Sequence, residues 1–242
     1  MSRALRKSLL CLVPLLFSMG AGTLLSQTLG TRAGAIYYPG DLAPAEVKMA
    51  VGISSGKPPA AAVEEASEIR WPLFEFMITY GLPENFALAG RVSTEIVTNH
   101  ISAGARWSYD AHPWAFGVGY DFAILFGKLG QFGFNNTVFG TISYPNLQVG
   151  YDFKNFTMTL RGELNLVNSL TSSTDDIELT SDAGRFNGGA VALYLEQPLW
   201  KDHYFTLGFK ANFIKFYYPT WLLFPTFNRY FFVPELVLGL RI

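Results

Sequence analysis

The chain has 242 residues, of which 50% are hydrophobic, 16% aromatic and only 15% charged, and its formal net charge is −1. Soluble domains carry roughly a quarter charged residues, so this chain is short of the groups that cover a water-facing surface. It also lacks the basic surplus of a nucleic-acid-binding protein. No run of about 20 apolar residues follows the N-terminal region, which excludes a transmembrane helix.

The N-terminal region predicts export across a membrane. Basic residues within positions 3–7 precede a short apolar core at 9–17 and small residues at 18–22, the pattern of a cleaved signal peptide spanning residues 1–22. Residues 23–44 are rich in Gly, Ala and Pro without a clear period. We expect them to form a loosely ordered periplasmic lead-in to the folded domain.

From residue 45 to residue 242 the chain alternates apolar and polar positions. The clearest run is Trp114–Phe126, in which every even position is aromatic, Val or Ile; in Phe156–Leu166 the even positions are apolar or Gly and the odd ones polar. A period of two predicts β-strands with one apolar face. The predicted strands, about ten (roughly eight to twelve fit the pattern), lie near residues 46–54, 70–80, 86–94, 99–109, 114–126, 137–153, 156–168, 186–199, 204–217 and 230–242.

In the predicted strand at 137–153, apolar and polar residues alternate cleanly only after Pro145, which predicts a bulge or bend in its earlier part.

The segments between the strands alternate in length. Short turns at 81–85, 110–113, 154–155 and 201–203 are interleaved with longer loops at 55–68, 127–136, 169–185 and 218–229, and only the connection at 95–98 breaks the rule. If the short turns share one end of a barrel, the longer loops fall at the other end.

The face of the strands opposite the bulky apolar side chains distinguishes a soluble β-sandwich or barrel from a membrane barrel. It is mostly Gly, Ala, Ser and Thr with about one charge per strand. A soluble sandwich or barrel would expose many charged residues there, whereas small residues suit the crowded interior of a narrow barrel. The pattern therefore favours a closed antiparallel transmembrane β-barrel with its bulky face toward lipid, over a secreted soluble β-protein.

Aromatic residues flank the short turns, as expected of the girdle at a membrane interface. The predicted periplasmic girdle comprises Tyr80, Phe86, Trp107, Tyr109, Trp114, Tyr151, Phe153, Phe156, Trp200 and Tyr204.

The hairpin Tyr80–Leu88, its partial echo at Tyr151–Leu160 and the closing strand resemble bacterial outer-membrane β-barrel proteins of the small porin-like kind, over about residues 45–242. The resemblance implies a bacterial outer-membrane location, contact with outer-membrane lipids and lipopolysaccharide, and insertion by the barrel-assembly machinery. It identifies no substrate and leaves the oligomeric state open.

By parity, ten charged residues point into the lumen. We expect Glu75 to lie near Arg91, and Lys210 near Glu235, on neighbouring strands. Two interpretations remain open: a pore with a charged constriction, or a salt-bridged interior that merely fills the barrel. The predicted lumen-lining charges are Glu75, Arg91, Arg106, Asp121, Arg161, Glu163, Glu196, Lys210, Glu235 and Arg241.

One pair of residues raises the alternative of an enzyme. His100 and Ser102 share a face near the outer end of a strand, with Glu95 nearby, and this His-x-Ser spacing resembles the outer-membrane lipid A deacylases. Ala103 stands where that family has Asn. We favour the account that both are hydrogen-bonding residues at the rim, because such pairs occur by chance in a long chain, and we assign no catalytic residue.

No metal or cofactor site is predicted. The acidic loop around Asp175 and Asp176 lacks the spacing and Gly of a calcium loop, and the single cysteine, Cys11, lies in the signal peptide. Lys215 falls on the lipid-facing side near the outer end, where it could reach lipid phosphates.

The sequence thus predicts a narrow passive pore or porin-like transporter. The alternatives are a closed structural or adhesive barrel that displays its outer loops, and a lipid hydrolase that uses His100 and Ser102.

Overall fold

A computed structural model describes residues 34–40, 42–57, 71–95, 97–131, 134–174, 177–200, 202–221 and 229–242. The predicted signal peptide and the lead-in up to residue 33 lie outside these residues. The described residues belong to one compact unit, Thr31–Ile242. Among them, no helix is long and apolar enough to cross a membrane.

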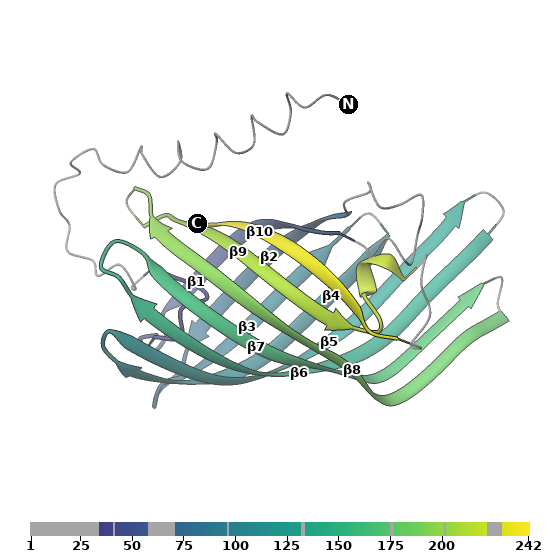
Figure 1. Ribbon diagram of the computed structural model, residues 1–242, viewed down its shortest axis with the longest axis horizontal. Helices are drawn as coiled ribbons and strands as arrows, with labels where there is room; N and C mark the ends of the chain where they lie inside the picture. Colours follow the sequence, from purple (N-terminus) through teal and green to yellow (C-terminus); the bar gives the residue numbers. More distant parts are fainter. Residues whose placement is uncertain are drawn as a thin grey trace, which may run out of the picture. The chain divides into compact units, whose positions relative to one another are not determined.

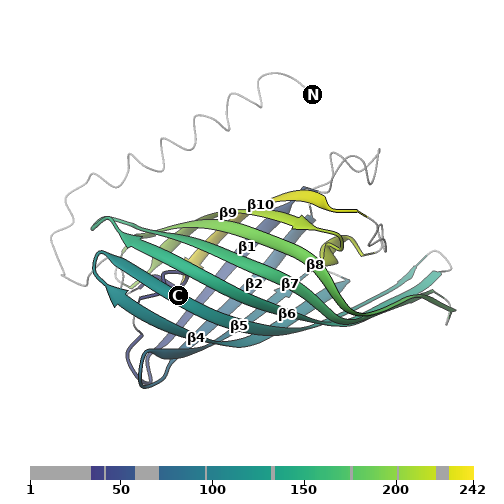
Figure 2. The ribbon, with the colours of Figure 1, turned by 60° about the horizontal axis from the view of Figure 1, so that its bottom comes forward.

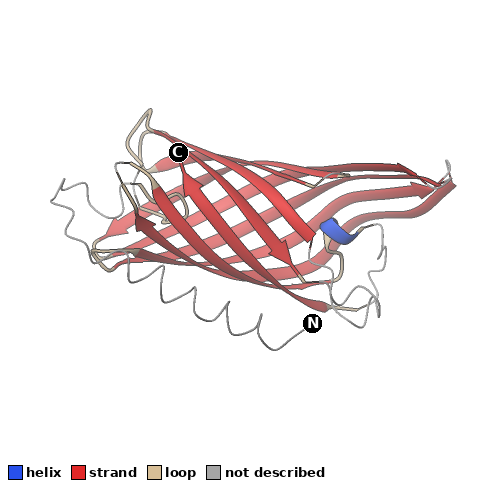
Figure 3. Ribbon diagram, turned by 90° about the horizontal axis from the view of Figure 1, so that it is seen from above, coloured by secondary structure: helices blue, strands red, loops and turns tan. Residues whose placement is uncertain are grey.

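Ten antiparallel strands form a closed barrel in which each strand pairs with its neighbours in sequence and β1 pairs with β10 (Figure 1). The prediction of an all-β, closed antiparallel barrel is confirmed. The strands are β1 (Val47–Gly56), β2 (Trp71–Gly81), β3 (Phe86–Thr94), β4 (Thr98–Ala111), β5 (Trp114–Gln131), β6 (Phe134–Asp152), β7 (Thr157–Thr174), β8 (Ile177–Pro198), β9 (Tyr204–Ile214) and β10 (Phe231–Arg241). Figure 3 shows that they run obliquely to the barrel axis, as closure of a barrel requires.

The alternation of the sequence becomes the two faces of the wall. In β1, Val47 and Val51 are exposed, whereas Lys48 and Ala50 are buried in the lumen. In β5 every even side chain from Trp114 to Phe126 is exposed. Exposed apolar patches on soluble monomers rarely exceed a few hundred Å². An apolar face that extends around the barrel therefore fits hydrocarbon, not water.

Two connections differ from the predicted loops. The segments 127–136 and 169–185 are mostly continuations of strands, so that the β5–β6 and β7–β8 hairpins extend past the end of the barrel near the short 3₁₀ helix η3 (Tyr218–Thr220) (Figure 2). Hydroxyl pairs at 2.7 Å, Thr137 with Ser173 and Thr141 with Ser169, link β6 to β7 in and next to these segments. Polar cross-strand pairs stabilise a ladder, and the polar and Gly-containing sequences of 127–136 and 169–185 have no clear period of two that would reveal a strand.

The predicted irregularity in β6 is present. The β6–β7 register shifts between Thr141 and Ile142, and the ladder passes from Ser143 to Asn146, leaving Tyr144 and Pro145 without a partner on β7. Proline has no N–H to donate to a ladder. The barrel wall is therefore interrupted for two residues.

The N-terminal segment enters the barrel. We expected residues 34–40 to be loosely ordered, but Ala35, Ile36, Tyr37 and Tyr38 are each at most 6% exposed. We call residues 34–40 the N-terminal plug.

Candidate functional site: the sealed lumen

The lumen holds a polar cavity of about 110 Å³, enough for several water molecules. Eight of the ten predicted lumen charges line it: Glu75, Arg91, Arg106, Asp121, Arg161, Glu163, Lys210 and Glu235. The other two lie elsewhere. Glu196 is buried beneath the N-terminal plug, and the Arg241 guanidinium lies 5.6 Å from the ring centre of Tyr204.

The charges form a chain of three ion pairs, two between strands and one within β7. Arg161 contacts Asp121 at 2.7 Å and Glu163 at 3.2 Å, and Lys210 contacts Glu163 at 2.6 Å. Buried charges are tolerated when they are paired in this way. The network joins β5, β7 and β9 across the interior of the barrel.

Glu75 and Arg91 lie on neighbouring strands and line the same cavity, but position in the ladder does not decide which charges form ion pairs. Lys210 lies directly opposite Glu235 in the β9–β10 ladder, yet its ammonium group binds Glu163. Glu235 accepts a hydrogen bond from Asn212 at 3.2 Å, and Glu75 accepts one from Ser54 at 3.4 Å. In a narrow closed barrel, long side chains reach strands that are not neighbours, so ladder register alone does not determine the pairs.

The backbone of the N-terminal plug is bound by the side chains of Glu196 and Lys48. The Glu196 carboxylate accepts hydrogen bonds from the backbone N–H groups of Ile36 at 2.7 Å, Tyr37 at 3.2 Å and Tyr38 at 3.0 Å. Hydrogen bonds to an ionised acceptor are roughly twice as strong as neutral ones. Lys48 adds a hydrogen bond from its ammonium group to the Ala35 carbonyl at 3.2 Å.

Aromatic contacts also hold the N-terminal plug, which we call the lower seal of the lumen. The ring of Tyr37 stacks on that of Tyr194 with centroids 3.7 Å apart, and the Arg91 guanidinium lies 6.0 Å from the Tyr37 ring centre. Arg91 and Tyr37 both line the cavity. The N-terminal plug therefore contacts the charged part of the lumen directly.

The opposite end of the lumen is closed by the segment that follows β9. Phe216 and Trp221 pack with Leu125, Val138 and other inward-facing apolar residues. Trp221 donates its indole N–H to the Thr98 hydroxyl at 2.8 Å. We call the segment Phe216–Trp221 the outer seal.

Asn187 fastens the outer seal to β8. It is fully buried, its amide group donates to the Phe216 carbonyl at 2.8 Å, and its carbonyl oxygen accepts from the Phe216 N–H at 2.6 Å. The cavity thus lies between two seals, each held by hydrogen bonds to the barrel wall.

The histidine that suggested an enzyme is part of this packing. His100 is buried, its Nε2 lies 3.1 Å from the Tyr144 hydroxyl, and its ring stacks on Tyr218 at 4.6 Å. Ser102 also lines the cavity, but no hydrogen bond joins it to His100 within the described residues. A serine nucleophile is activated by an adjacent base, usually through such a bond, and among the described residues His100 is instead bonded to Tyr144.

Glu95 lies in the connection between β3 and β4 and is 8% exposed. Burial raises the pKa of its carboxyl group to about 7, because the charged form is desolvated. Glu95 is therefore a titrating group near neutral pH at the outer end of the barrel.

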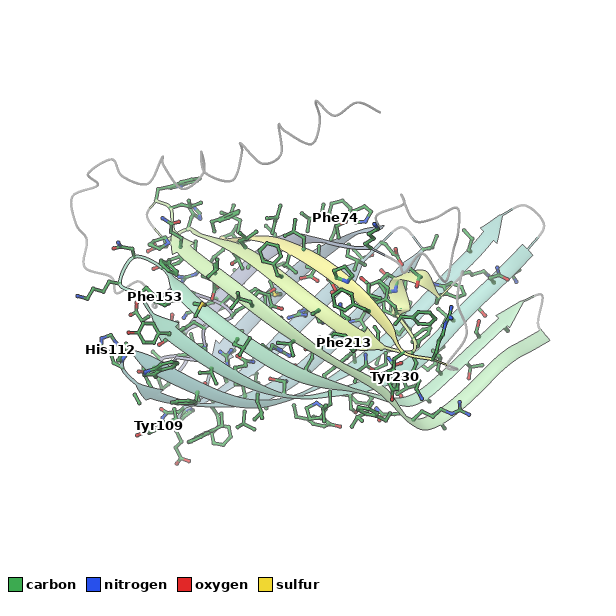
Figure 4. The ribbon with its side chains drawn as sticks, viewed as in Figure 1. Phe74, Tyr109, His112, Phe153, Phe213 and Tyr230 are labelled. Atoms are coloured by element: carbon green, nitrogen blue, oxygen red, sulfur yellow. The ribbon has the colours of Figure 1, made fainter. Side chains whose placement is uncertain are left out.

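The aromatic girdle has one exception. Tyr109, Phe153 and His112 lie toward the end of the barrel with the short turns (Figure 4). Tyr204, by contrast, is 5% exposed and faces inward. The reason is parity, since it precedes the outward-facing Phe205 in β9. Of the others, Tyr80, Phe86, Trp107, Tyr109, Trp114, Phe153 and Trp200 are exposed, and Tyr151 and Phe156 are half-buried.

Within the described ranges, no group of three or more His, Cys, Asp or Glu side chains is arranged to hold a metal ion. Asp175 and Asp176 of the acidic loop lie outside those ranges. The N-terminal plug is the functional feature that the strand pattern missed. The apolar triplet Ile36-Tyr37-Tyr38, inside a Gly- and Pro-rich segment, was the one signal for it.

No protein-family profile matches the sequence, and no curated protein matches it by sequence. Among solved structures, the chain is similar to Neisserial surface protein A (14% identity, 81% of this chain and 94% of that one, TM-score 0.36). It is also similar to the KdgM porin (9%, 79% and 97%, 0.39) and to outer membrane phospholipase A from Escherichia coli (11%, 91% and 94%, 0.36). Likenesses this low carry no argument about function.

Proposed function

We propose that this protein is an outer-membrane β-barrel that passes small polar solutes when its N-terminal plug leaves the lumen. In this proposal residues 1–22 direct export, the barrel-assembly machinery inserts the barrel, and outer-membrane lipids and lipopolysaccharide surround it. The plugged form is the resting state of a narrow, gated pore.

The outer surface supports the membrane placement. Large apolar side chains from all ten strands are exposed, among them Phe74, Leu147 and Phe213 at 54% or more. Aromatic side chains gather toward the end with the short turns, as at the periplasmic interface of outer-membrane barrels.

The polar cavity between the two seals is the observation that supports the proposal of a gated pore. Its eight charged side chains form a lining that suits hydrated ions and small polar solutes. The three N–H bonds of the N-terminal plug all go to the carboxylate of Glu196. Because the plug forms no ladder with the strands, it can be released without rebuilding the barrel.

A second candidate is a permanently closed barrel that displays its long β5–β6 and β7–β8 hairpins. The presence of both seals in the same structure favours it. Loop display would require no passage through the lumen, so conductance separates the two functions.

The experiment is single-channel recording of the full chain in planar lipid bilayers. We expect the wild-type barrel to open rarely, Glu196→Ala to open often, and Glu75→Ala or Arg91→Ala to change the ion selectivity of the openings. If Glu196→Ala, inserted and folded, conducts no more than the wild type, the gated pore is wrong and the display barrel takes its place.

A further inference from the structure

The lipid-facing wall of the barrel contains an apolar groove that no feature of the lumen explains. It has a volume of about 610 Å³ and crosses five strands, β5 to β9. Its raised edges are the exposed side chains Val118, Leu147, Leu164, Val191 and Phe213.

Residues with a short side chain or none form the floor of the groove. Pro145, Gly162 and Gly189 lie at outward-facing positions between the raised residues. A Cβ added at Gly162 would meet no atom within 4 Å. The floor lies over the interruption of the β6–β7 ladder at Tyr144 and Pro145.

A cationic side chain stands at the β9 end of the groove. Lys215 directly follows the last residue of β9, Ile214, and its backbone N–H donates to the Asn187 carbonyl at 2.9 Å. The chain is thus still held against β8 at Lys215, about 7 Å beyond Phe213 toward the outer end. The Lys215 ammonium group lies 4.8 Å from the ring centre of Tyr230, and within the described residues it has no acidic partner. Figure 4 shows Tyr230 beyond Phe213, toward the end of the barrel where η3 lies.

The tilt of the strands orients the groove. Register places Val118, Leu147, Gly162 and Val191 in one row across β5 to β8, with Gly189 and Phe213 paired next to it. The strands run obliquely to the barrel axis (Figure 3), so a row across them is oblique as well. Phe213 is nine residues from the start of β9 at a short turn, whereas Val118 is only four residues from the start of β5, so the row approaches the end with the short turns as it passes from β9 to β5. The groove thus runs inward from Lys215 into the apolar band.

We propose that this groove is a binding site for one phosphate-bearing lipid, with an acyl chain along the groove and the phosphate at Lys215. Charge complementarity selects this occupant: an apolar groove of about 610 Å³ accommodates an acyl chain, and Lys215, which has no acidic partner among the described residues, can pair with an anionic head group at the outer end. The inference rests on the proposed membrane placement but not on conduction.

The test is native mass spectrometry of the full chain, released from detergent after incubation with phosphatidylglycerol or with phosphatidylcholine. We expect one phosphatidylglycerol molecule to be retained in preference to phosphatidylcholine. Lys215→Gln should lower the affinity for phosphatidylglycerol about fivefold and abolish the preference. Gly162→Leu should fill the groove and lower the retention of both lipids.

Two matched controls keep the test specific. Lys154→Gln removes a lysine from the turn between β6 and β7 at the opposite end of the barrel, and Ala103→Leu adds a leucine to the exposed outer face of β4. Both should bind phosphatidylglycerol like the wild type. Equal retention of the two lipids by the wild type, or no effect of Gly162→Leu and Lys215→Gln, would overturn the site.

A second copy of the chain is the competing occupant. If the protein is a dimer in detergent, and Gly162→Leu but not Ala103→Leu makes it a monomer, the groove is a protein interface and the lipid site is wrong. Failure of lipid binding leaves the conductance result unchanged, so the two proposals fail separately.

Discussion

Replacing Glu196 with alanine tests how the N-terminal plug is held. The side chain is 1% exposed and accepts three backbone hydrogen bonds from the plug, at 2.7 to 3.2 Å. Hydrogen bonds to a charged group contribute about 1.5–3 kcal/mol each. Removing the carboxylate also removes its desolvation penalty of several kcal/mol. The net loss of plug binding is therefore about 3 kcal/mol, which raises the ratio of open to plugged barrels roughly a hundredfold.

The assay is the fraction of time that single barrels conduct in a planar bilayer. Glu235→Ala is the matched control, because Glu235 lies in the same lumen but hydrogen-bonds Asn212 and, within the described residues, makes no hydrogen bond to the plug. We expect long openings for Glu196→Ala and rare openings for Glu235→Ala and the wild type. Equal open fractions for the two variants would refute the reasoning that Glu196 anchors the plug.

Three further predictions concern stability, measured by urea unfolding of the barrel in lipid vesicles with tryptophan fluorescence. Arg161→Gln should lower the free energy of unfolding by about 3 kcal/mol, because it leaves Asp121 without its ion-pair partner and Glu163 with Lys210 alone; a change below about 1 kcal/mol would contradict the ion-pair network. Asn187→Ala should cost about 2 kcal/mol and expose the outer seal to protease, because it removes the two buried hydrogen bonds that join the Asn187 amide to the backbone of Phe216; unchanged proteolysis would show that other contacts hold the seal. Glu95 has a pKa of about 7 in the folded barrel against 4.5 in the unfolded chain, so the unfolded chain loses its proton first and stability should fall as pH rises from about 4.5 to 7. Glu95→Gln should flatten that slope, and an unchanged slope would assign it to another group.

The alternation of apolar and polar residues predicts the barrel because it determines two things at once: the register in which strands pair, and which face of the wall lies against lipid. In Trp114–Phe126 the alternation fixes which side chains face out, and a shift of one residue would turn all of them inward. Ten such strands close because every edge then has a partner. The strand positions and the inward direction of the charges therefore follow from the sequence.

The contacts inside the lumen do not follow in the same way. Parity says that Lys210 faces inward, but not that its ammonium group reaches Glu163 on β7 in preference to Glu235 across the ladder. That choice depends on the width of the barrel and on side-chain length. Pairing across a closed interior is a property of the whole barrel.

The N-terminal plug was missed for a different reason. Residues 34–40 have no period and make no ladder; their backbone N–H groups bind a side chain 158 or more residues away. The prediction that Tyr204 belongs to the aromatic girdle was wrong for a simpler reason. Tyr204 lies beside a turn, as girdle residues do, but the alternation of β9 points its side chain inward.

The central claim, that the N-terminal plug controls passage through the lumen, is tested most directly by locking the plug to the wall. A Cβ added at Gly117 would lie 2.9 Å from the Cβ of Pro39, so a small shift brings a cysteine pair within disulfide range. In a Glu196→Ala chain that also carries Cys11→Ser, Pro39→Cys and Gly117→Cys, a single bilayer is recorded before and after a reductant is added. The account predicts a closed barrel when the disulfide is intact and frequent openings once it is reduced. The same conductance in both states, with the disulfide verified, would contradict it.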